Sequence, residues 1–219
     1  DAAQTMVRKE LTWHACAERI KQAVAGIAQQ PKIRKEPKIA WISTWNARCG
    51  IANYSHALTA CIPPQRLTIF ASHITERTAL DQANVIRSWN AQQSENFEVA
   101  LEHIEEQGIG AVVIQYNFGF TSIENLARFI DALEQRAVAV YIFFHSTADV
   151  QIEGKWVSLS HITPTLKKAR GLFVHGIEDM NRLKSWGLQQ RAVYFPHGID
   201  VAPSHAQTAQ KVARFCDTK

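Results

Sequence analysis

The sequence lacks several features that would place it in a specialised class of proteins. It contains no run of about 18 apolar residues and no visible signal peptide, so we expect no transmembrane segment. The nine histidines form no HExxH or other metal spacing, and the fingerprint GxGxxG is missing, so we expect no metal ion and no cofactor. The four cysteines form no CxxC pair, which favours reduced thiols in a cytoplasmic protein.

A large excess of one charge sign is also missing. The chain carries 24 Lys and Arg against 20 Asp and Glu, a net charge of +4. That excess suits an anionic ligand but is too small to predict binding to nucleic acid. With 46% hydrophobic and 20% charged residues, the 219-residue chain has the composition of one large globular domain or one and a half smaller ones. Because it begins at Asp1 rather than at Met, we expect a piece of a longer protein.

The stretch Lys38–Ser55 has the pattern of a strand, a loop and a helix in succession. Residues 38–43 are an apolar run after Pro37, which predicts a buried parallel strand. The polar loop 44–49 leads to Gly50, which opens an apolar-periodic helix. This geometry aims free backbone N–H groups at an anion, and glycine lets a ligand approach the backbone. The alternative is a plain strand-to-helix turn in which Gly50 serves only the backbone conformation.

Strands and helices alternate along the rest of the chain. Ala111–Tyr116 and Val138–Phe144 are the clearest strands, and we expect them at the centre of the sheet because they are apolar on both faces. Strands separated by helices of 10–15 residues predict an α/β fold, a Rossmann-like parallel sheet with helices on both faces. The other expected strands are 66–72, 84–89, 171–174 and 192–195, the expected helices are 11–30, 95–107, 123–135, 163–169 and 178–186, and 146–160 is expected to be a polar loop.

Prolines and charges indicate where the main domain begins. Residues 31–37 are charged and bracketed by prolines, as in a linker. We therefore expect an N-terminal helix and linker over 1–36, one Rossmann-like domain over 37–203 and a helical tail over 204–219.

Polar side chains follow several of the expected strands. In parallel sheets, ligands bind beyond the carboxyl ends of the strands. We therefore expect a single cleft there, with Asn46, Gly50, Asn117 and His145 lining it. The candidate catalytic residue is His145, and the candidate substrate-binding residues are Asn46, Arg48, Gly50, Asn117 and His197. We interpret Trp45 as a core residue and His175 as a structural one.

Five segments occur in a fixed order: RCGIANYSHAL (48–58), VVIQYNFGF (112–120), YIFFHST (141–147), ARGLFVHGIEDMNRLKSWG (169–187) and VYFPHGID (193–200). Together they make the chain from about Lys38 to Val201 resemble the N-terminal half of a GT-B glycosyltransferase, of the retaining class grouped as family 4 or group 1. The resemblance implies that this domain binds a glycan or lipid-linked acceptor. A C-terminal domain would then bind most of the nucleotide-sugar donor, with catalysis in the cleft between the two.

The resemblance also implies roles for individual residues. Gly50 matches the glycine of the first loop, which approaches the donor phosphates, although the family often has two adjacent glycines there. His145 matches a histidine near the reacting sugar. The run 196–200 matches the segment that leads into the second domain. The opening helix resembles the closing helix of a preceding domain of the same kind.

Two functions therefore remain open. The chain is part of a glycosyltransferase that becomes active only with its donor-binding domain, or it is a non-catalytic domain of the same fold that binds a glycan, a nucleotide or a protein. Only 19 residues follow Asp200, too few for the donor-binding domain, so we expect the chain alone to be inactive.

Overall fold

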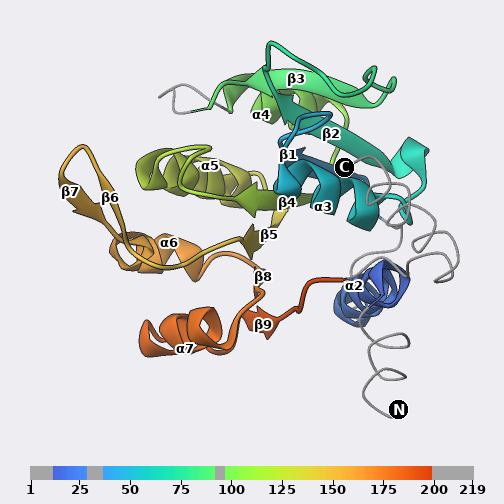
Figure 1. Ribbon diagram of the computed structural model, residues 1–219. Helices are drawn as coiled ribbons and strands as arrows, with labels where there is room; N and C mark the ends of the chain where they lie inside the picture. Colours follow the sequence, from blue (N-terminus) through green and yellow to red (C-terminus); the bar gives the residue numbers. More distant parts are fainter. Residues whose placement is uncertain (1–11, 29–36, 92–96, 199–219) are drawn as a thin grey trace, which may run out of the picture.

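The computed structural model describes residues 12–28, 37–91 and 97–198. Their centre is a seven-stranded sheet in which all neighbouring strands run parallel, in the order β3-β2-β1-β4-β5-β8-β9 (Figure 1). The strands are β1 (Ile39–Ser43), β2 (Leu67–Ser72), β3 (Val85–Trp89), β4 (Ala111–Tyr116), β5 (Ala139–Phe144), β8 (Gly171–Val174) and β9 (Ala192–Tyr194). The expected Rossmann-like α/β fold is confirmed, with β4 at the centre of the sheet and β5 beside it.

Helices cover both faces of this sheet. α2 (Trp13–Ala28) and α3 (Gly50–Thr59) lie on one face, and α4 (Glu98–Glu106), α5 (Ile123–Gln135), α6 (Thr163–Leu166) and α7 (Ile177–Ser185) lie on the other (Figure 1). Short 3-10 helices occur at η1 (Pro64–Arg66) and η2 (Leu159–Ile162).

Each face of the sheet has its own apolar core, because successive strand residues point to opposite faces. Val140, Ile142 and Phe144 pack under α4 to α7. Tyr141 and Phe143 pack under α2 and α3. A strand buried on both faces reads as a continuous apolar run, which is why β4 and β5 were the easiest strands to predict.

The predicted helix boundaries agree with the structure where a local signal exists. α5 begins and ends where its apolar periodicity predicts, and Ser122 caps it by accepting a hydrogen bond from the Asn125 N–H at 3.2 Å. α4 begins at Glu98, later than predicted. The start of the helix predicted over 95–107, most of the predicted linker and the predicted tail 204–219 lie outside the described residues.

The predicted polar loop 146–160 instead contains a β-hairpin. It consists of β6 (Val150–Ile152) and β7 (Lys155–Val157), which pair antiparallel and form a separate two-stranded sheet. The turn residues Glu153 and Gly154 have φ angles of 49° and 77°, as a two-residue hairpin turn requires. Each strand has only three residues, which is too short for a period-two pattern to be recognised in the sequence.

The N-terminal helix packs against the main domain. The ring centroids of Trp13 on α2 and Tyr54 on α3 are 5.3 Å apart in an edge-to-face arrangement. The Cys16 thiol lies 3.8 Å from the Pro196 carbonyl oxygen. A Cβ added to Gly198 would come within 2.7 Å of the Trp13 ring, so the chain after β9 passes directly beside α2.

Candidate functional site

A pocket of about 470 Å³ opens at the carboxyl edge of the sheet. It lies where the start of α3, the residue after β5 and the segment after β9 meet α2. The lining residues are Trp13, Cys49, Gly50, Ile51, Asn53, Tyr54, Ala57, His145, His197 and Gly198. None of these side chains is an Asp, Glu, Lys or Arg, so this described part of the lining offers dipoles, a hydroxyl group and aromatic rings rather than full charges.

One wall of the pocket is the N-terminus of α3. Cys49 is the N-cap residue and makes no side-chain capping bond. The first amide of the helix with a backbone partner belongs to Asn53, which donates to the Cys49 carbonyl oxygen at 3.2 Å. The N–H groups of Gly50, Ile51 and the residue after them have no acceptor within the helix, as at any helix start. A Cβ at Gly50 would meet no atom within 4 Å, so the packing of the described residues does not require glycine here.

Next to this helix start lies a cluster of three histidines around one tyrosine, of which Tyr54, His145 and His197 line the pocket. His145, His175 and His197 follow β5, β8 and β9, which are neighbours in the sheet. Their ring centroids lie 5.3, 5.2 and 5.3 Å from that of Tyr54. His175 and His197 stack on each other with centroids 3.9 Å apart. Because these parallel strands end in register, at Phe144, Val174 and Tyr194, three sequence-distant histidines come together.

Burial keeps this histidine cluster uncharged near neutral pH. It lowers the pKa of His145 to about 3, with a further contribution from the neighbouring His175 and His197. Burial also lowers the pKa of His175 to about 4, although the hydrogen bond to the Phe195 carbonyl oxygen acts in the opposite direction. The pKa of His197 is lowered by burial too. Removing a cation from water is costly, so the neutral imidazole is the stable form here.

The hydrogen bonds fix which ring nitrogen carries the proton. His175 Nδ1 lies 2.7 Å from the Phe195 carbonyl oxygen, which can only accept, so Nδ1 is the protonated nitrogen. His145 Nε2 lies 2.8 Å from Gln115 Oε1, so in the neutral ring Nε2 donates and Nδ1 holds a lone pair. A lone pair of this kind can accept a hydrogen bond from a ligand hydroxyl group.

The structure brings together three of the predicted site residues. Gly50, His145 and His197 line the pocket, as expected for residues at the carboxyl ends of strands. Arg48 is exposed in the loop before α3 and is not part of the lining.

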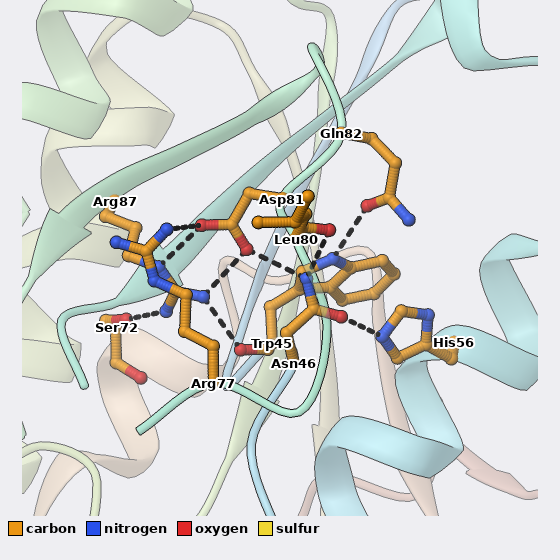
Figure 2. A network of polar contacts seen from close by, with 9 residues as sticks. All are labelled: Trp45, Asn46, His56, Ser72, Arg77, Leu80, Asp81, Gln82 and Arg87. Carbon is orange, nitrogen blue, oxygen red and sulfur yellow. Dashed lines mark hydrogen bonds and ion pairs between the residues drawn. The ribbon is translucent and has the colours of Figure 1, made fainter. Parts of the chain in front are cut away.

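The prediction that Asn46 and Asn117 line the same cleft is wrong. Asn117 Oδ1 accepts the Gly119 N–H at 2.9 Å, so this side chain closes its own turn. Asn46 is 2% exposed and has a φ of 50°. Its Nδ2 group donates to the Leu80 carbonyl oxygen and to Asp81 Oδ1, and its Oδ1 lies 3.0 Å from His56 Nε2 (Figure 2). Both ends of the Asn46 amide are engaged inside the protein.

Sequence reasoning missed two members of the site. Tyr54 is 3% exposed and packs as a core residue of the helix that Gly50 opens, but it is also the centre of the histidine cluster. His175 was interpreted as structural and lies in that cluster. The available signal was that a histidine follows each of three expected strands in succession.

A second polar network holds the loop that carries His145. The Asp179 carboxylate accepts hydrogen bonds from Thr147 N at 2.9 Å and from Thr147 Oγ1 at 2.6 Å. Arg182 donates to both Thr147 Oγ1 and Asp179. These bonds join the exit of β5 to α7, so His145 projects from a loop fixed at both sides.

Neither the comparison of the sequence with protein-family models nor the search of curated proteins produced a match. Within the described ranges, no group of three or more His, Cys, Asp or Glu side chains is arranged to hold a metal ion. Over the same part of the chain, no helix has both the length and the apolar character needed to cross a membrane.

Proposed function

We propose that this chain forms the acceptor side of a GT-B glycosyltransferase, which moves a sugar from a nucleotide-sugar donor to a glycan or lipid-linked acceptor. A second domain supplies most of the donor contacts. The observation that carries the proposal is that Gly50 and His145 line one pocket at the carboxyl edge of the sheet. These are the two positions that the resemblance to the retaining family 4 class singles out.

The start of α3 is suited to hold a phosphate oxygen of the donor. Its first N–H groups are free of helix partners, and the helix dipole places a partial positive charge at this end. Among the residues that the structure describes, no carboxylate lines the pocket to repel an anion. The exposed Arg48 is close enough in sequence to add a cation once a second domain closes over the loop.

His145 is suited to hold the transferred sugar. Glycosyl transfer develops positive charge at the anomeric carbon. An imidazolium at this point would oppose that charge, whereas the low pKa of His145 keeps the ring neutral. Its Nδ1 lone pair can accept a hydrogen bond from a sugar hydroxyl group while Gln115 fixes the ring. His145 therefore orients the sugar and does not donate a proton.

The chain alone is expected to bind a donor only weakly. The α3 N-terminus is part of a phosphate site, and water in the open pocket weakens each polar contact. We expect a dissociation constant on the order of millimolar, near −4 kcal/mol, for uridine or guanosine diphosphate sugars. Calorimetric titration measures this, with free glucose as the control. Micromolar binding, or steady release of free nucleotide in the presence of acceptors, would mean that a complete active site lies within these residues.

Replacement of His145 by alanine is expected to lower the turnover of the chain joined to its donor-binding domain by about a hundredfold, as for other lost polar contacts in active sites. Steady-state kinetics and thermal unfolding measure activity and folding separately. His103→Ala is the matched control, because this histidine lies on α4 at the opposite face. Equal turnover in the His145 variant and the unaltered enzyme would remove His145 from the mechanism.

A non-catalytic glycan-binding domain is the second candidate. The pocket lining without charged side chains favours it, since aromatic rings with neutral hydrogen-bonding groups suit sugars. The two candidates differ in one measurable respect. A binding domain holds a glycan at micromolar concentration in the absence of nucleotide. In that case, a protein that contains this chain together with further domains neither hydrolyses nor transfers a nucleotide sugar.

A further inference from the structure

A mostly buried ion pair, Arg87 with Asp81, contacts the loop between β1 and α3, which comprises residues 44–49 (Figure 2). Arg87 on β3 donates from Nε to Asp81 Oδ2 at 2.9 Å and from Nη2 to Asp81 Oδ1 at 2.8 Å. The two side chains are 9% and 15% exposed. A buried pair of this kind adds little net stability compared with apolar side chains of the same shape. Its main structural effect is to hold the backbone at Trp45 and Ser72 and the side chain of Asn46 in place.

Both members of the pair reach the backbone or side chains of loop 44–49. Arg87 Nη2 donates to the Trp45 carbonyl oxygen at 3.0 Å, and Arg87 Nη1 donates to the Ser72 carbonyl oxygen. Asp81 Oδ1 accepts from Asn46 Nδ2 at 2.8 Å. One guanidinium group therefore joins β3, the end of β2 and the loop that leaves β1.

The next residue of the loop is held in a conformation that side chains rarely adopt. Asn46 has a left-handed φ of 50°, which costs about 1 kcal/mol or more for most residues. Its carbonyl oxygen accepts the Thr78 N–H at 2.7 Å. The Trp45 ring stacks on His56 of α3 with centroids 3.7 Å apart. The bend at Asn46 is therefore fixed by contacts to four residues, which are Arg87, Asp81, Thr78 and His56.

This bend determines where α3 begins. Only three residues separate Asn46 from Gly50, and Cys49 N donates to the Ala47 carbonyl oxygen at 2.8 Å, so the remaining loop is a tight turn. Cys49, Gly50 and Ile51 then line the pocket. Asp81 and Arg87 themselves do not line it. A shift of the Trp45–Asn46 backbone is transmitted through this short turn to the helix N-terminus.

We propose that Asp81 and Arg87 are positioning residues, which hold loop 44–49 so that the N-terminus of α3 points into the pocket. Burial alone would raise the pKa of Asp81, but hydrogen bonds from Arg87 and Asn46 and the charge of Arg77 outweigh it and lower the pKa, which keeps the carboxylate ionised. The effect on the position of the loop is argued from the hydrogen bonds of Arg87 and Asp81 to Trp45 and Asn46. The effect on donor binding rests on the proposed function.

The test replaces Arg87 by lysine, which keeps the charge but loses the planar fork that reaches Asp81, Trp45 and Ser72 together. Amide hydrogen exchange measured by NMR reports how firmly the loop is held. The relevant amides are the N–H groups of Cys49, Asn53 and Thr78, which donate the backbone hydrogen bonds of the loop. We expect their exchange to become about tenfold faster or more, as for loss of a charged hydrogen bond. In the enzyme joined to its donor-binding domain, we expect a KM for nucleotide sugar about tenfold higher with kcat within about twofold.

Arg136→Lys is the matched control, because Arg136 pairs with Glu105 at 3.1 Å on the surface and should leave both readouts unchanged. If Arg87→Lys does not fold, Asn46→Gly replaces it, since glycine accepts the bend at residue 46 but removes the links to Asp81 and His56. Unchanged exchange in the folded variant overturns the proposal, and so does faster exchange with an unchanged KM in an active enzyme. Faster exchange without transfer activity in any form supports the positioning role and contradicts the proposed function instead.

Discussion

Replacement of Phe143 by alanine is expected to lower the free energy of unfolding by about 3–5 kcal/mol, the usual cost of deleting a buried aromatic ring. Phe143 is 2% exposed and is the second-last residue of β5. It stacks on Phe173 of the neighbouring strand with centroids 4.4 Å apart, and it meets Tyr54 at 6.2 Å and Phe195 at 5.5 Å. The cavity would open directly beneath the histidine cluster, between the sheet and α3. The surrounding rings are rigid and can fill this space only in part.

Urea unfolding followed by circular dichroism measures this loss. Phe143→Leu is the control, because it keeps most of the apolar volume and should cost less than half as much. Val99→Ala, at an exposed position of α4, should leave the unfolding midpoint almost unchanged. A loss below about 1 kcal/mol in Phe143→Ala would contradict the packing described for this face of the sheet.

Acidification from pH 7.5 to pH 5 is expected to destabilise the protein through its buried histidines. The folded-state pKa values of His145 and His175 are about 3 and about 4, below the ordinary value of 6.5. The unfolded chain therefore binds protons in this range while the folded protein does not. The stability present above pH 6.5 is lost as the pH falls toward the folded-state values, by about 2 kcal/mol for each of the two histidines at pH 5.

Denaturant unfolding at several pH values between 7.5 and 5 measures how steeply the free energy of unfolding changes with pH. The double variant His145→Gln, His175→Gln should have a much smaller slope over this interval, with a remainder from His56 and His197, whose pKa values are also lowered. The lowered pKa of Asp81 affects the free energy of unfolding only at more acidic pH, below the ordinary carboxyl value of 3.8. A slope equal in the double variant and the unaltered protein would show that these imidazoles titrate normally in the folded state.

The sequence was sufficient to predict the parts of the fold that depend on nearest neighbours. β4 and α5 have the predicted boundaries, because burial on both faces and a serine cap leave a direct pattern in the residues. The β6–β7 hairpin was not predicted, since its strands are short and Trp156, at 70% exposed, is an apolar residue that packs against no core. Exposed apolar residues of this kind do not follow the alternation on which strand prediction depends.

The site was predictable only to the level of which residues follow strands. Gly50, His145 and His197 reach the pocket because the direction of a parallel strand decides where its end lies. Asn46 follows β1 in the same way, but Arg87 and Asp81 hold the loop so that its side chain points inward. Those two partners lie 35 or more residues further along the chain. No local pattern in the sequence predicts which of two asparagines a distant ion pair will engage.

The order of strands in the sheet also determines when the pocket can form during synthesis. His145, His175 and His197 leave the ribosome in that order, attached to β5, β8 and β9, and β9 is the edge strand at one end of the sheet. A domain generally folds as a unit during synthesis. Because β9 is the last strand of the sheet along the chain, the sheet and its pocket can be completed only after the third histidine has left the ribosome. The pocket is therefore completed together with the sheet that supports it.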